Sequence, residues 1–292
     1  MLVEKGIYMK IIRTIKDIKA YSKACKEAGA SIGLVPTMGA LHEGHLTLMR
    51  TAKKACDVVI ASVFVNPVQF GPNEDYDAYP RRFAEDCEKL ESVGVDAVFH
   101  PEPEEMYPAG YATYVNVDGD ITHKLCGAKR PGHFRGVATV VTKLMNLSRA
   151  DQAFFGQKDA QQVVVIRRFV EDLNMPVEVH MVPIVREVSG LARSSRNAYL
   201  SAEEKQAALV LSESLKKAKE AYAAGERDAE VLKKIVREHI ASERMAAVDY
   251  VDLYAFPSLE PVEMVMQDAL LAIAVKIGKT RLIDNVILEV AA

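Results

Sequence analysis

The sequence lacks the features that mark several large classes of protein. Its four cysteines, Cys25, Cys56, Cys87 and Cys126, include no C-x-x-C pair, which argues against a zinc knuckle and a thioredoxin-like redox motif. No basic segment followed by an apolar stretch opens the chain, and no run approaches the roughly 18 apolar residues that a membrane helix needs. We therefore expect reduced thiols and a cytoplasmic protein without a membrane partner.

The sequence also lacks a strong charge of either sign. A formal net charge of -3 over 292 residues gives no overall attraction to nucleic acid, but it allows a local basic pocket for a small anionic substrate. Hydrophobic residues make up 49% and charged residues 26%, as in an ordinary globular protein. A chain of this length is expected to form one large domain and a smaller one.

The hydrophobic pattern alternates between helices and strands over the first two thirds of the chain. Helical spacing from Ile15 to Cys25 precedes a short apolar run at 32–35, and the β-branched run at 58–65 is typical of a strand covered on both faces. This order predicts an α/β fold with a Rossmann-like, doubly wound parallel sheet. Further helices are expected at 79–93 and 163–170, and further strands at 97–99, 152–155 and 177–182.

The pattern changes after about Arg186. Ser201 and Glu204 have the spacing of a capping box that opens a helix reaching about Ala223. We expect a second, smaller α+β domain at the C-terminal end, with domain boundaries at 1–185 and 186–292. Its other expected elements are a helix at 229–242 and antiparallel strands at 248–254, 269–275 and 282–290.

The most informative segment runs from Pro36 to His45, where the first long strand gives way to a helix. A helix N-terminus at the end of a parallel strand offers N–H groups and a partial positive charge to phosphate. His42 and His45 can face one ligand from one turn, Gly44 allows close approach, and imidazole can donate to phosphate oxygens as pyrophosphate leaves. A His-x-x-His pair is also compatible with two solvated residues or a partial metal site. The segment is neither a P-loop nor a dinucleotide fingerprint.

Polar loops follow the later strands as well. Lys158 lies in one of them, and the segment 190–197 supplies serine hydroxyls and arginine, which are the donors that a triphosphate needs. The neutral amides of Asn66, Gln69 and Gln162 could bind a hydroxylated carboxylic acid and leave its carboxylate nucleophilic. Each loop alone could be a solvated turn, and Gln69 could simply cap its loop. Their joint placement at strand ends favours one binding site.

The segment from Arg130 to Gly136 combines two glycines with cationic side chains. This composition is typical of a lid that closes over anionic substrates and excludes water from a reactive intermediate, with Arg130 as a substrate contact. The alternative is a surface turn in which Phe134 fills the seam between domains.

Taken in order, these motifs resemble the pantoate–β-alanine ligase family, the pantothenate synthetases, which are related to class I aminoacyl-tRNA synthetases and cytidylyltransferases. The resemblance is collinear from Val35 to Asn197, whereas the last hundred residues have no comparable signature. It implies that ATP and pantoate give pantoyl adenylate and pyrophosphate, and that β-alanine then attacks the adenylate to give pantothenate and AMP. The segments that match are 36–45, 64–70, 130–136, 156–162 and 194–197.

The resemblance also implies residue roles. His45 matches the family's proton donor, Gln69 and Gln162 match its pantoate-binding glutamines, and Arg193 departs from the family by standing where Met or another apolar residue is usual. Mg²⁺ is expected with the nucleotide, held by unknown ligands, and the family implies a homodimer. The implied ATP contacts are Met38, Gly39, Ala40, Leu41, His42, Glu43, Gly44, His45, Gly156, Gln157, Lys158, Asp159, Val185, Arg193, Ser194, Ser195 and Arg196. The implied catalytic residues are His42, His45, Lys158, Ser194, Ser195 and Arg196.

Two other functions are compatible with a nucleotide pocket. A nucleotidyltransferase of the same superfamily would attach the nucleotide to a phosphorylated acceptor and keep it in the product. It would need basic side chains to bind that acceptor, in place of Asn66, Gln69 and Gln162. A regulatory module that senses nucleotide would not need His45 or Lys158 to be chemically competent. A tRNA-charging enzyme is disfavoured by the acidic balance and by the lack of an anticodon-binding extension.

Overall fold

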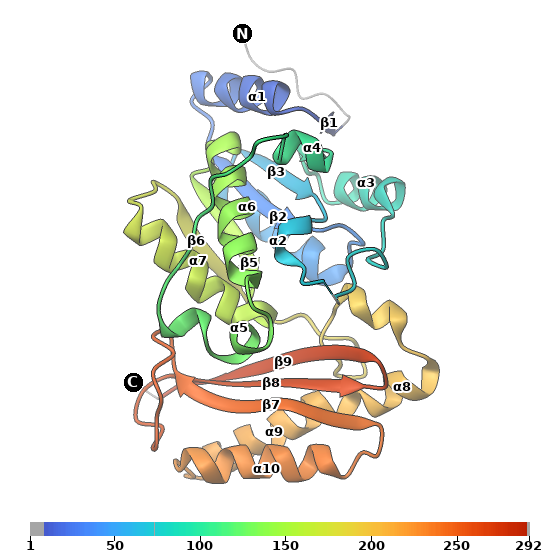
Figure 1. Cartoon of the computed structure of the whole chain (residues 1–292), viewed down its shortest axis with the longest axis vertical. Helices are drawn as coiled ribbons and strands as arrows, with labels where there is room; N and C mark the ends of the chain where they lie inside the picture. The colour runs from blue at the N-terminus through green and yellow to red at the C-terminus, as the bar shows by residue number, and fades with distance from the viewer. Residues whose placement is uncertain (1–8, 73, 291–292) are drawn as a thin grey trace. The chain divides into compact units, whose positions relative to one another are not determined.

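Six parallel strands form the sheet that positions the N-terminal motifs (Figure 1). The computed structural model describes residues 9–72 and 74–290. The sheet has the order β1-β4-β3-β2-β5-β6, in which every neighbouring pair is parallel, so the predicted doubly wound α/β fold is confirmed. Its strands are β1 (Lys10–Ile12), β2 (Ile32–Thr37), β3 (Val58–Val63), β4 (Ala97–Phe99), β5 (Gln152–Gly156) and β6 (Glu178–Val182).

The chain divides into two compact units. The first takes the chain up to Asp118 together with Arg130–Gly156 and Val165–Pro183. The second takes Gly119–Lys129, Gln157–Val164 and the chain from Ile184 onward. The domain boundary expected at residue 185 stays a prediction.

Helices cover the parallel sheet because their apolar stripes match its buried side chains. Leu48, Met49 and Ala52 of α2 pack with Val35 and Ala61 of the sheet in one continuous core. Helix α7 begins in the second unit and continues in the first. The helices that pack in this part of the chain are α1 (Ile15–Glu27), α2 (Glu43–Ala55), α3 (Phe83–Ser92), α4 (Pro103–Met106), α6 (His133–Ser148) and α7 (Ala160–Asp172).

The second unit contains a separate antiparallel sheet, β7-β8-β9, as the sequence predicts (Figure 1). Leu215 of α9 and Val236 of α10 share a core with Ile273 of the sheet, which explains why the helices pack on it. Its elements are α5 (Leu125–Lys129), α8 (Ala202–Ala207), α9 (Leu209–Ala223), α10 (Ala229–Ala241), β7 (Ala246–Ala255), β8 (Ala269–Ile277) and β9 (Thr280–Leu288), with short 3-10 turns η2 (Asp120–Thr122), η3 (Gln157–Asp159) and η4 (Ser195–Tyr199).

Three sequence-based expectations need correction. The capping box of Ser201 and Glu204 is present, but the helix that it opens ends at Ala207, and α9 starts after Ala208. The helix expected from residue 79 begins only at Phe83, because Pro80 precedes it. Helix α6 was not predicted, since the glycines near its start favoured a loop.

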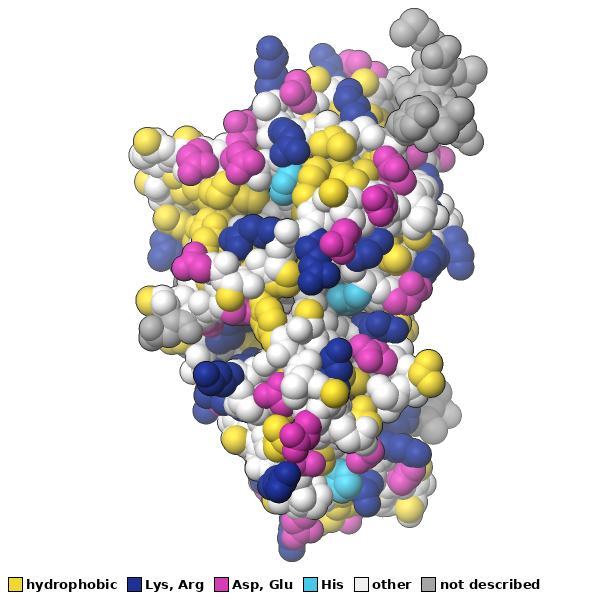
Figure 2. Space-filling model, turned by 90° about the vertical axis from the view of Figure 1, so that its right-hand side faces the viewer, with side chains coloured by type: hydrophobic (Ala, Val, Ile, Leu, Met, Phe, Trp, Pro, Cys, Tyr) yellow, Lys and Arg dark blue, Asp and Glu magenta, His cyan; other side chains and the backbone are white. Residues whose placement is uncertain are grey.

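No helix in residues 9–72 and 74–290 is long and apolar enough to cross a membrane. On the face of the molecule seen in Figure 2, acidic and basic side chains are interspersed, and neither sign forms a continuous area.

Candidate active site

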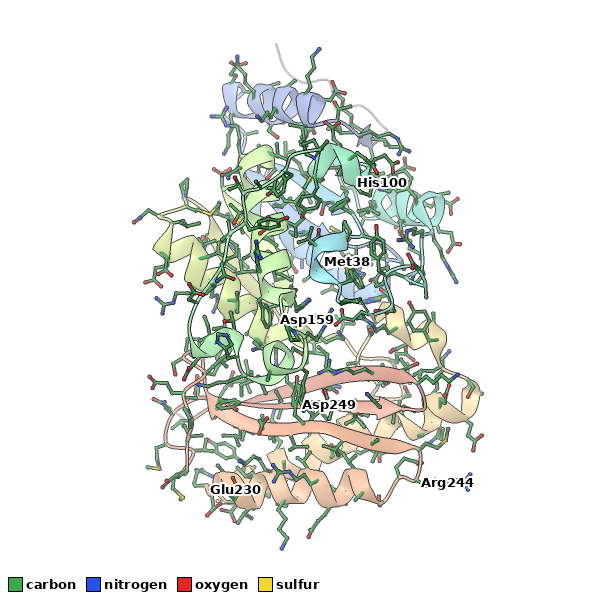
Figure 3. The ribbon with its side chains drawn as sticks, viewed as in Figure 1. Met38, His100, Asp159, Glu230, Arg244 and Asp249 are labelled. Carbon is green, nitrogen blue, oxygen red and sulfur yellow. The ribbon has the colours of Figure 1, made fainter. Side chains whose placement is uncertain are left out.

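The first unit places two predicted motifs at one edge of its sheet. The chain runs from β2 to β3 and β4 on one side of β2, and later returns to place β5 on the other side. In doubly wound sheets, ligands bind outside the carboxyl ends of the strands where the strand order reverses in this way. The histidine segment leaves the carboxyl end of β2, and the segment with Asn66 and Gln69 follows β3. Met38 lies in the β2–α2 connection (Figure 3).

His42 and His45 form one unit at the start of α2. His42 is the N-cap, and its backbone N–H donates to Nδ1 of His45 across 3.4 Å. The two rings stack with centroids 4.0 Å apart and planes inclined by 26°. Because Nδ1 of His45 accepts a hydrogen bond, the proton of its neutral ring lies on Nε2, which is therefore a donor. A helix N-terminus with a hydrogen-bond donor beside it suits a phosphate group.

A buried carboxylate holds the loop before these histidines. Asp86 of α3 accepts hydrogen bonds from the backbone N–H groups of Ala40 at 2.9 Å and Leu41 at 2.7 Å. Ala40 has φ of 50°, and a side chain on Gly39, whose φ is 84°, would meet Asp86 at 3.0 Å. Lys89 also donates to the carbonyl oxygen of Leu41 at 2.9 Å. The loop conformation is thus fixed from α3.

Sequence reasoning missed Asp86. The signal was present, because Asp86 lies four residues before the buried Leu90 and hence on the same face of a helix. Desolvation raises the pKa of Asp86 above its ordinary 3.8, while the hydrogen bonds from Leu41 and Ala40 act in the opposite direction. An acidic residue on an apolar helix face needs partners, and here the partners belong to the histidine loop.

The predicted substrate amides are connected to one another. Asn66 Nδ2 donates to Oε1 of Gln69 at 3.0 Å, and Gln69 Nε2 donates to the sulfur of Met38 at 3.2 Å. The hydroxyl of Tyr107 donates to Oδ1 of Asn66 at 2.8 Å. Asn66 and Gln69 are buried, so these bonds fix their orientation. The structure therefore brings Met38, Asn66 and Gln69 together.

Arg130 holds this cluster in place from the turn before α6. Its guanidinium donates to both carboxylate oxygens of Glu74, at 2.7 and 2.6 Å, and to Nε2 of His133 at 3.0 Å. Nδ1 of His133 then donates to the backbone oxygen of Gln69 at 2.9 Å. A direct contact between Arg130 and a substrate stays a prediction.

The loop expected at 130–136 is helical in its second half, and a role of this segment as a lid stays a prediction. Residues from His133 onward form the first turn of α6, with Gly132 as a left-handed N-cap. A Cβ on Gly136 would lie 2.6 Å from the backbone of Gln69, so this glycine lets the helix pack directly against the Gln69 turn. The absence of a side chain on Gly136 therefore permits this close packing.

The second unit contains most of the other predicted ATP contacts. Gly156 ends β5 in the first unit, and the turn η3 that follows contains Lys158 and Asp159; Asp159 is labelled in Figure 3. Lys158 Nζ lies 3.5 Å from Oδ2 of Asp159. The two glutamines after them differ in role. The side chain of Gln161 is buried and bonds to the backbone of Ile121, Lys124 and Cys126, whereas the side chain of the half-buried Gln162 makes no hydrogen bond within the described part of the chain. Gln162 is thus the one suited to a ligand.

The segment with the serines is ordered by its own hydrogen bonds. Ser194 caps the turn η4 by accepting from the N–H of Arg196, and the N–H of Arg193 donates to the oxygen of Val185 at 2.9 Å. The side chain of Arg193 lies 3.8 Å from Glu187, while its buried Nε has no partner among the described residues. The unusual arginine is therefore directed to Glu187.

Sequence reasoning also missed Asn285, in the part of the chain where it found no signature. Asn285 Nδ2 donates to the backbone oxygens of Gln157 at 2.9 Å and Lys158 at 3.0 Å. The signal in the sequence is a pair of polar residues, Asp284 and Asn285, that interrupts the apolar run from Leu282 to Leu288. Asp284 is 2% and Asn285 4% exposed.

These features define the class of domain to which the first unit belongs. A parallel sheet with a histidine-bearing helix N-terminus at its strand-order reversal, and with polar amides beside it, is a nucleotide-binding α/β domain of the Rossmann-like type. Within residues 9–72 and 74–290, no group of three or more His, Cys, Asp or Glu side chains is placed to hold a metal ion.

Comparison with known proteins identifies the particular family. The family model for pantoate-beta-alanine ligase matches residues 10–287, and the chain belongs to this family. It is 60% identical to the pantothenate synthetase of Pelotomaculum thermopropionicum over 96% of this chain and 99% of that protein. It is 56% identical to that of Heliobacterium modesticaldum over 97% of this chain and 100% of that protein.

Comparison with solved structures supports the same family assignment. The crystal structure of pantothenate synthetase from Thermus thermophilus superimposes with a TM-score of 0.90 at 42% identity, covering 95% of this chain and 99% of that one. The pantoate-beta-alanine ligase from Francisella tularensis, solved as a complex with beta-gamma ATP and β-alanine, gives a TM-score of 0.78 at 34% identity, covering 95% and 97%. The resemblance found in the sequence is confirmed.

Proposed function

We propose that this enzyme joins (R)-pantoate to β-alanine at the expense of ATP, through an enzyme-bound pantoyl adenylate. In the first step a carboxylate oxygen of pantoate attacks the α-phosphorus of ATP, and pyrophosphate leaves. In the second step the amine of β-alanine attacks the acyl carbon, loses a proton, and AMP leaves with the electrons of the broken C–O bond. The single observation that best supports this is the His42–His45 pair in the same unit as the Met38–Gln69–Asn66 cluster.

The first unit supplies a phosphate donor and a neutral acid site. We assign His45 Nε2 and the N-terminus of α2 to the phosphates, where a fixed donor stabilises charge that builds up as pyrophosphate leaves. We assign Asn66 and Gln69 to the pantoate site. Both hydrogens of Asn66 Nδ2 are already donated, to Oε1 of Gln69 and to the backbone oxygen of Gly136, so Gln69 makes the contact with pantoate and Asn66 orients it. Because neither amide carries a charge, the carboxylate keeps its nucleophilicity.

The second unit supplies cationic donors. We assign Lys158, Ser194, Ser195 and Arg196 to the same triphosphate, and Gln162 to pantoate. Support comes from the family to which the chain belongs and from the order of these segments within their own unit. Lysine acts here as a point charge and arginine as a fork.

Further features belong to this proposal: Mg²⁺ and the homodimer rest on the family resemblance, whereas the location and the absence of nucleic-acid and membrane partners rest on the composition of the sequence. Mg²⁺ enters as the complex with ATP, because it prefers phosphate oxygens and water as ligands. The enzyme is a cytoplasmic homodimer, and its partners are small molecules without nucleic acid or membrane. Light scattering of the purified chain tests the dimer directly, since a monomer mass would exclude it.

The proposal is tested by product analysis. Incubation with pantoate, β-alanine and Mg–ATP should yield AMP, pyrophosphate and pantothenate in equal amounts. Without the amine, pyrophosphate should be released in about one equivalent per site, with pantoyl adenylate left on the enzyme. Release of ADP and phosphate would point to an acyl phosphate, and a product that keeps the nucleotide would point to the nucleotidyltransferase alternative.

A further inference from the structure

Asn285 clamps the backbone on both sides of the Lys158 peptide unit. Its Nδ2 donates to the oxygens of Gln157 and Lys158, at 2.9 and 3.0 Å, and its Oδ1 accepts from Nε2 of Gln157 at 3.3 Å. These bonds use every hydrogen of the Asn285 amide. The turn that carries Lys158 is thereby fixed to strand β9, 127 residues further along the chain.

Asn285 is itself held by its neighbour. Asp284 Oδ1 accepts from the backbone N–H of Asn285 at 2.8 Å, and the carboxylate pairs with both terminal nitrogens of Arg186, at 2.6 and 3.0 Å. The Asp284 side chain is 1% exposed, so this pair is protected from solvent. Arg186 also donates to the oxygen of Gly190 at 3.2 Å. Asp284 and Asn285 of β9 therefore fix the turn that carries Lys158 and the segment from Arg186 to Gly190. The latter segment leads to Arg193–Arg196, which the family resemblance assigns to ATP.

We propose that Asn285 is a positioning residue for adenylation, acting through the backbone of Lys158. The inference rests on the proposed function, because it assumes that Lys158 meets the triphosphate. Lysine has a long, flexible side chain, and its ammonium reaches a fixed point only if the peptide that bears it is fixed. Among residues 9–72 and 74–290, the half-buried Lys158 ammonium has only the 3.5 Å contact with Asp159 to orient it. The Asn285 clamp supplies the rest of that order.

The test is a double-mutant cycle. The measured quantity is the rate at which the first equivalent of pyrophosphate per site is released in the absence of the amine, which we call the pyrophosphate burst. Asn285→Ala should slow pantoate-dependent pyrophosphate release on the order of 100-fold, the cost of a small displacement of a catalytic group. Asn285→Asp has the same shape but turns oxygens toward two carbonyl oxygens, and it should be slowed at least as much. In the Lys158→Ala background, Asn285→Ala should change the rate by less than about threefold, since there is no ammonium left to position.

Two results would overturn the inference. One is an equal loss from Asn285→Ala with and without Lys158, because this is what a general effect on folding gives. The other is a normal burst in Asn285→Ala. Should Asn285→Ala show no cooperative unfolding transition, Asn285→Ser takes its place in the same cycle, because it keeps a short donor.

Tyr222→Phe is the matched control. It removes a hydrogen bond of 3.1 Å to the backbone oxygen of Glu289, just beyond the same strand, without touching either loop. Its burst rate should match that of the wild type. A wild type that releases no pyrophosphate with pantoate overturns the proposed function itself, whereas an active wild type with an additive cycle overturns only the role of Asn285.

Discussion

The carboxylate of Asp86 accepts a hydrogen bond of 2.7 Å from the backbone N–H of Leu41, the residue that precedes the first histidine of the site. The contact spans 45 residues of sequence and joins α3 to the loop after β2. Asp86 has no exposed surface, so its charge is balanced by the N–H groups of this loop and by Lys89. The carboxylate and the N–H groups of the loop stabilise one another, because either group left in the interior without a hydrogen-bond partner would lower the stability of the fold.

Asp86→Asn should disturb the histidine loop without changing the size of the side chain. An amide can accept from only one of the two N–H groups and turns a donor toward the other. We expect the free energy of unfolding to fall by about 1–3 kcal/mol. The KM for ATP should rise about tenfold. Part of the lost free energy falls on the loop that binds phosphate, because Asp86 no longer holds that loop in its binding conformation.

Glu85→Gln is the control for this experiment. Glu85 is exposed on the same helix, and its pair with Arg82 at 3.6 Å is open to solvent. Its KM for ATP should equal that of the wild type. An unchanged KM in Asp86→Asn would show that the loop keeps its conformation without the carboxylate.

His45→Ala and Lys158→Ala should each lower the rate of adenylation by roughly two to three orders of magnitude, as expected for loss of a transition-state donor. The side-chain geometry makes the histidine prediction more specific. Since Nδ1 of His45 accepts from His42, the donor is Nε2. His45→Gln places an amide near Nε2 and should retain more activity than His45→Asn, whose amide lies near Nδ1.

Single-turnover pyrophosphate release measures these rates. Near-normal release in either alanine variant would remove that residue from the chemistry. Equal losses in the glutamine and asparagine variants would contradict the assignment of Nε2 as the donor.

Glu74 should give the enzyme a pH-dependent part of its stability. Desolvation alone would raise the pKa of Glu74, but the hydrogen bonds and charge of Arg130 outweigh it and hold the pKa below its ordinary 4.5. The unfolded chain therefore binds the proton more readily, and this stabilisation is present above pH 4.5 and lost as the pH falls through the folded-state pKa.

Urea unfolding from neutral pH to below pH 4.5 measures this effect. The wild type should be more stable than Glu74→Gln at neutral pH, and the difference should shrink as the pH falls. Glu27→Gln, which removes an exposed pair with Lys23, should follow the wild type throughout. A difference between wild type and Glu74→Gln that stays constant with pH would mean that the Arg130 pair does not lower the pKa.

The fold was predictable where the signal was local. The β-branched run at 58–65 became β3, and the Ser201–Glu204 capping box formed as expected. Helix α6 was missed because Gly132 and Gly136 favour a loop when their surroundings are unknown. Gly136 is helical here because its missing side chain lets α6 meet the backbone of Gln69, a long-range requirement that no local pattern contains.

The same distinction applies to the candidate site. The histidine and amide residues were recognisable because each lies in a short motif after a strand. Asp86 and Asn285 form hydrogen bonds with backbone atoms 45 and 127 residues away. Their roles depend on these long-range contacts, which no local sequence pattern contains. Whether the motifs of both units meet one triphosphate stays a prediction, which the His45 and Lys158 variants address.

Arg193→Met restores the residue type that the family resemblance leads one to expect. The buried Nε of Arg193 has no hydrogen-bond partner among residues 9–72 and 74–290, and removing such an atom relieves a desolvation cost of about 1–3 kcal/mol. The ion pair lost with it is weak, because the guanidinium lies 3.8 Å from Glu187. Glu187 keeps a hydrogen bond of 3.3 Å from Asn197, so its carboxylate does not become unpaired.

We therefore expect Arg193→Met to raise the free energy of unfolding by about 1 kcal/mol. The KM for ATP should change by less than about threefold, a difference of under about 1 kcal/mol, because the arginine is directed to Glu187. Arg193→Ala is the matched variant: it removes the same charge but leaves a space, and should be less stable than Arg193→Met. A KM for ATP that rises tenfold or more in both variants would show that the guanidinium binds phosphate. If the substitution changed only the packing of the site, the KM of Arg193→Ala would differ from that of Arg193→Met.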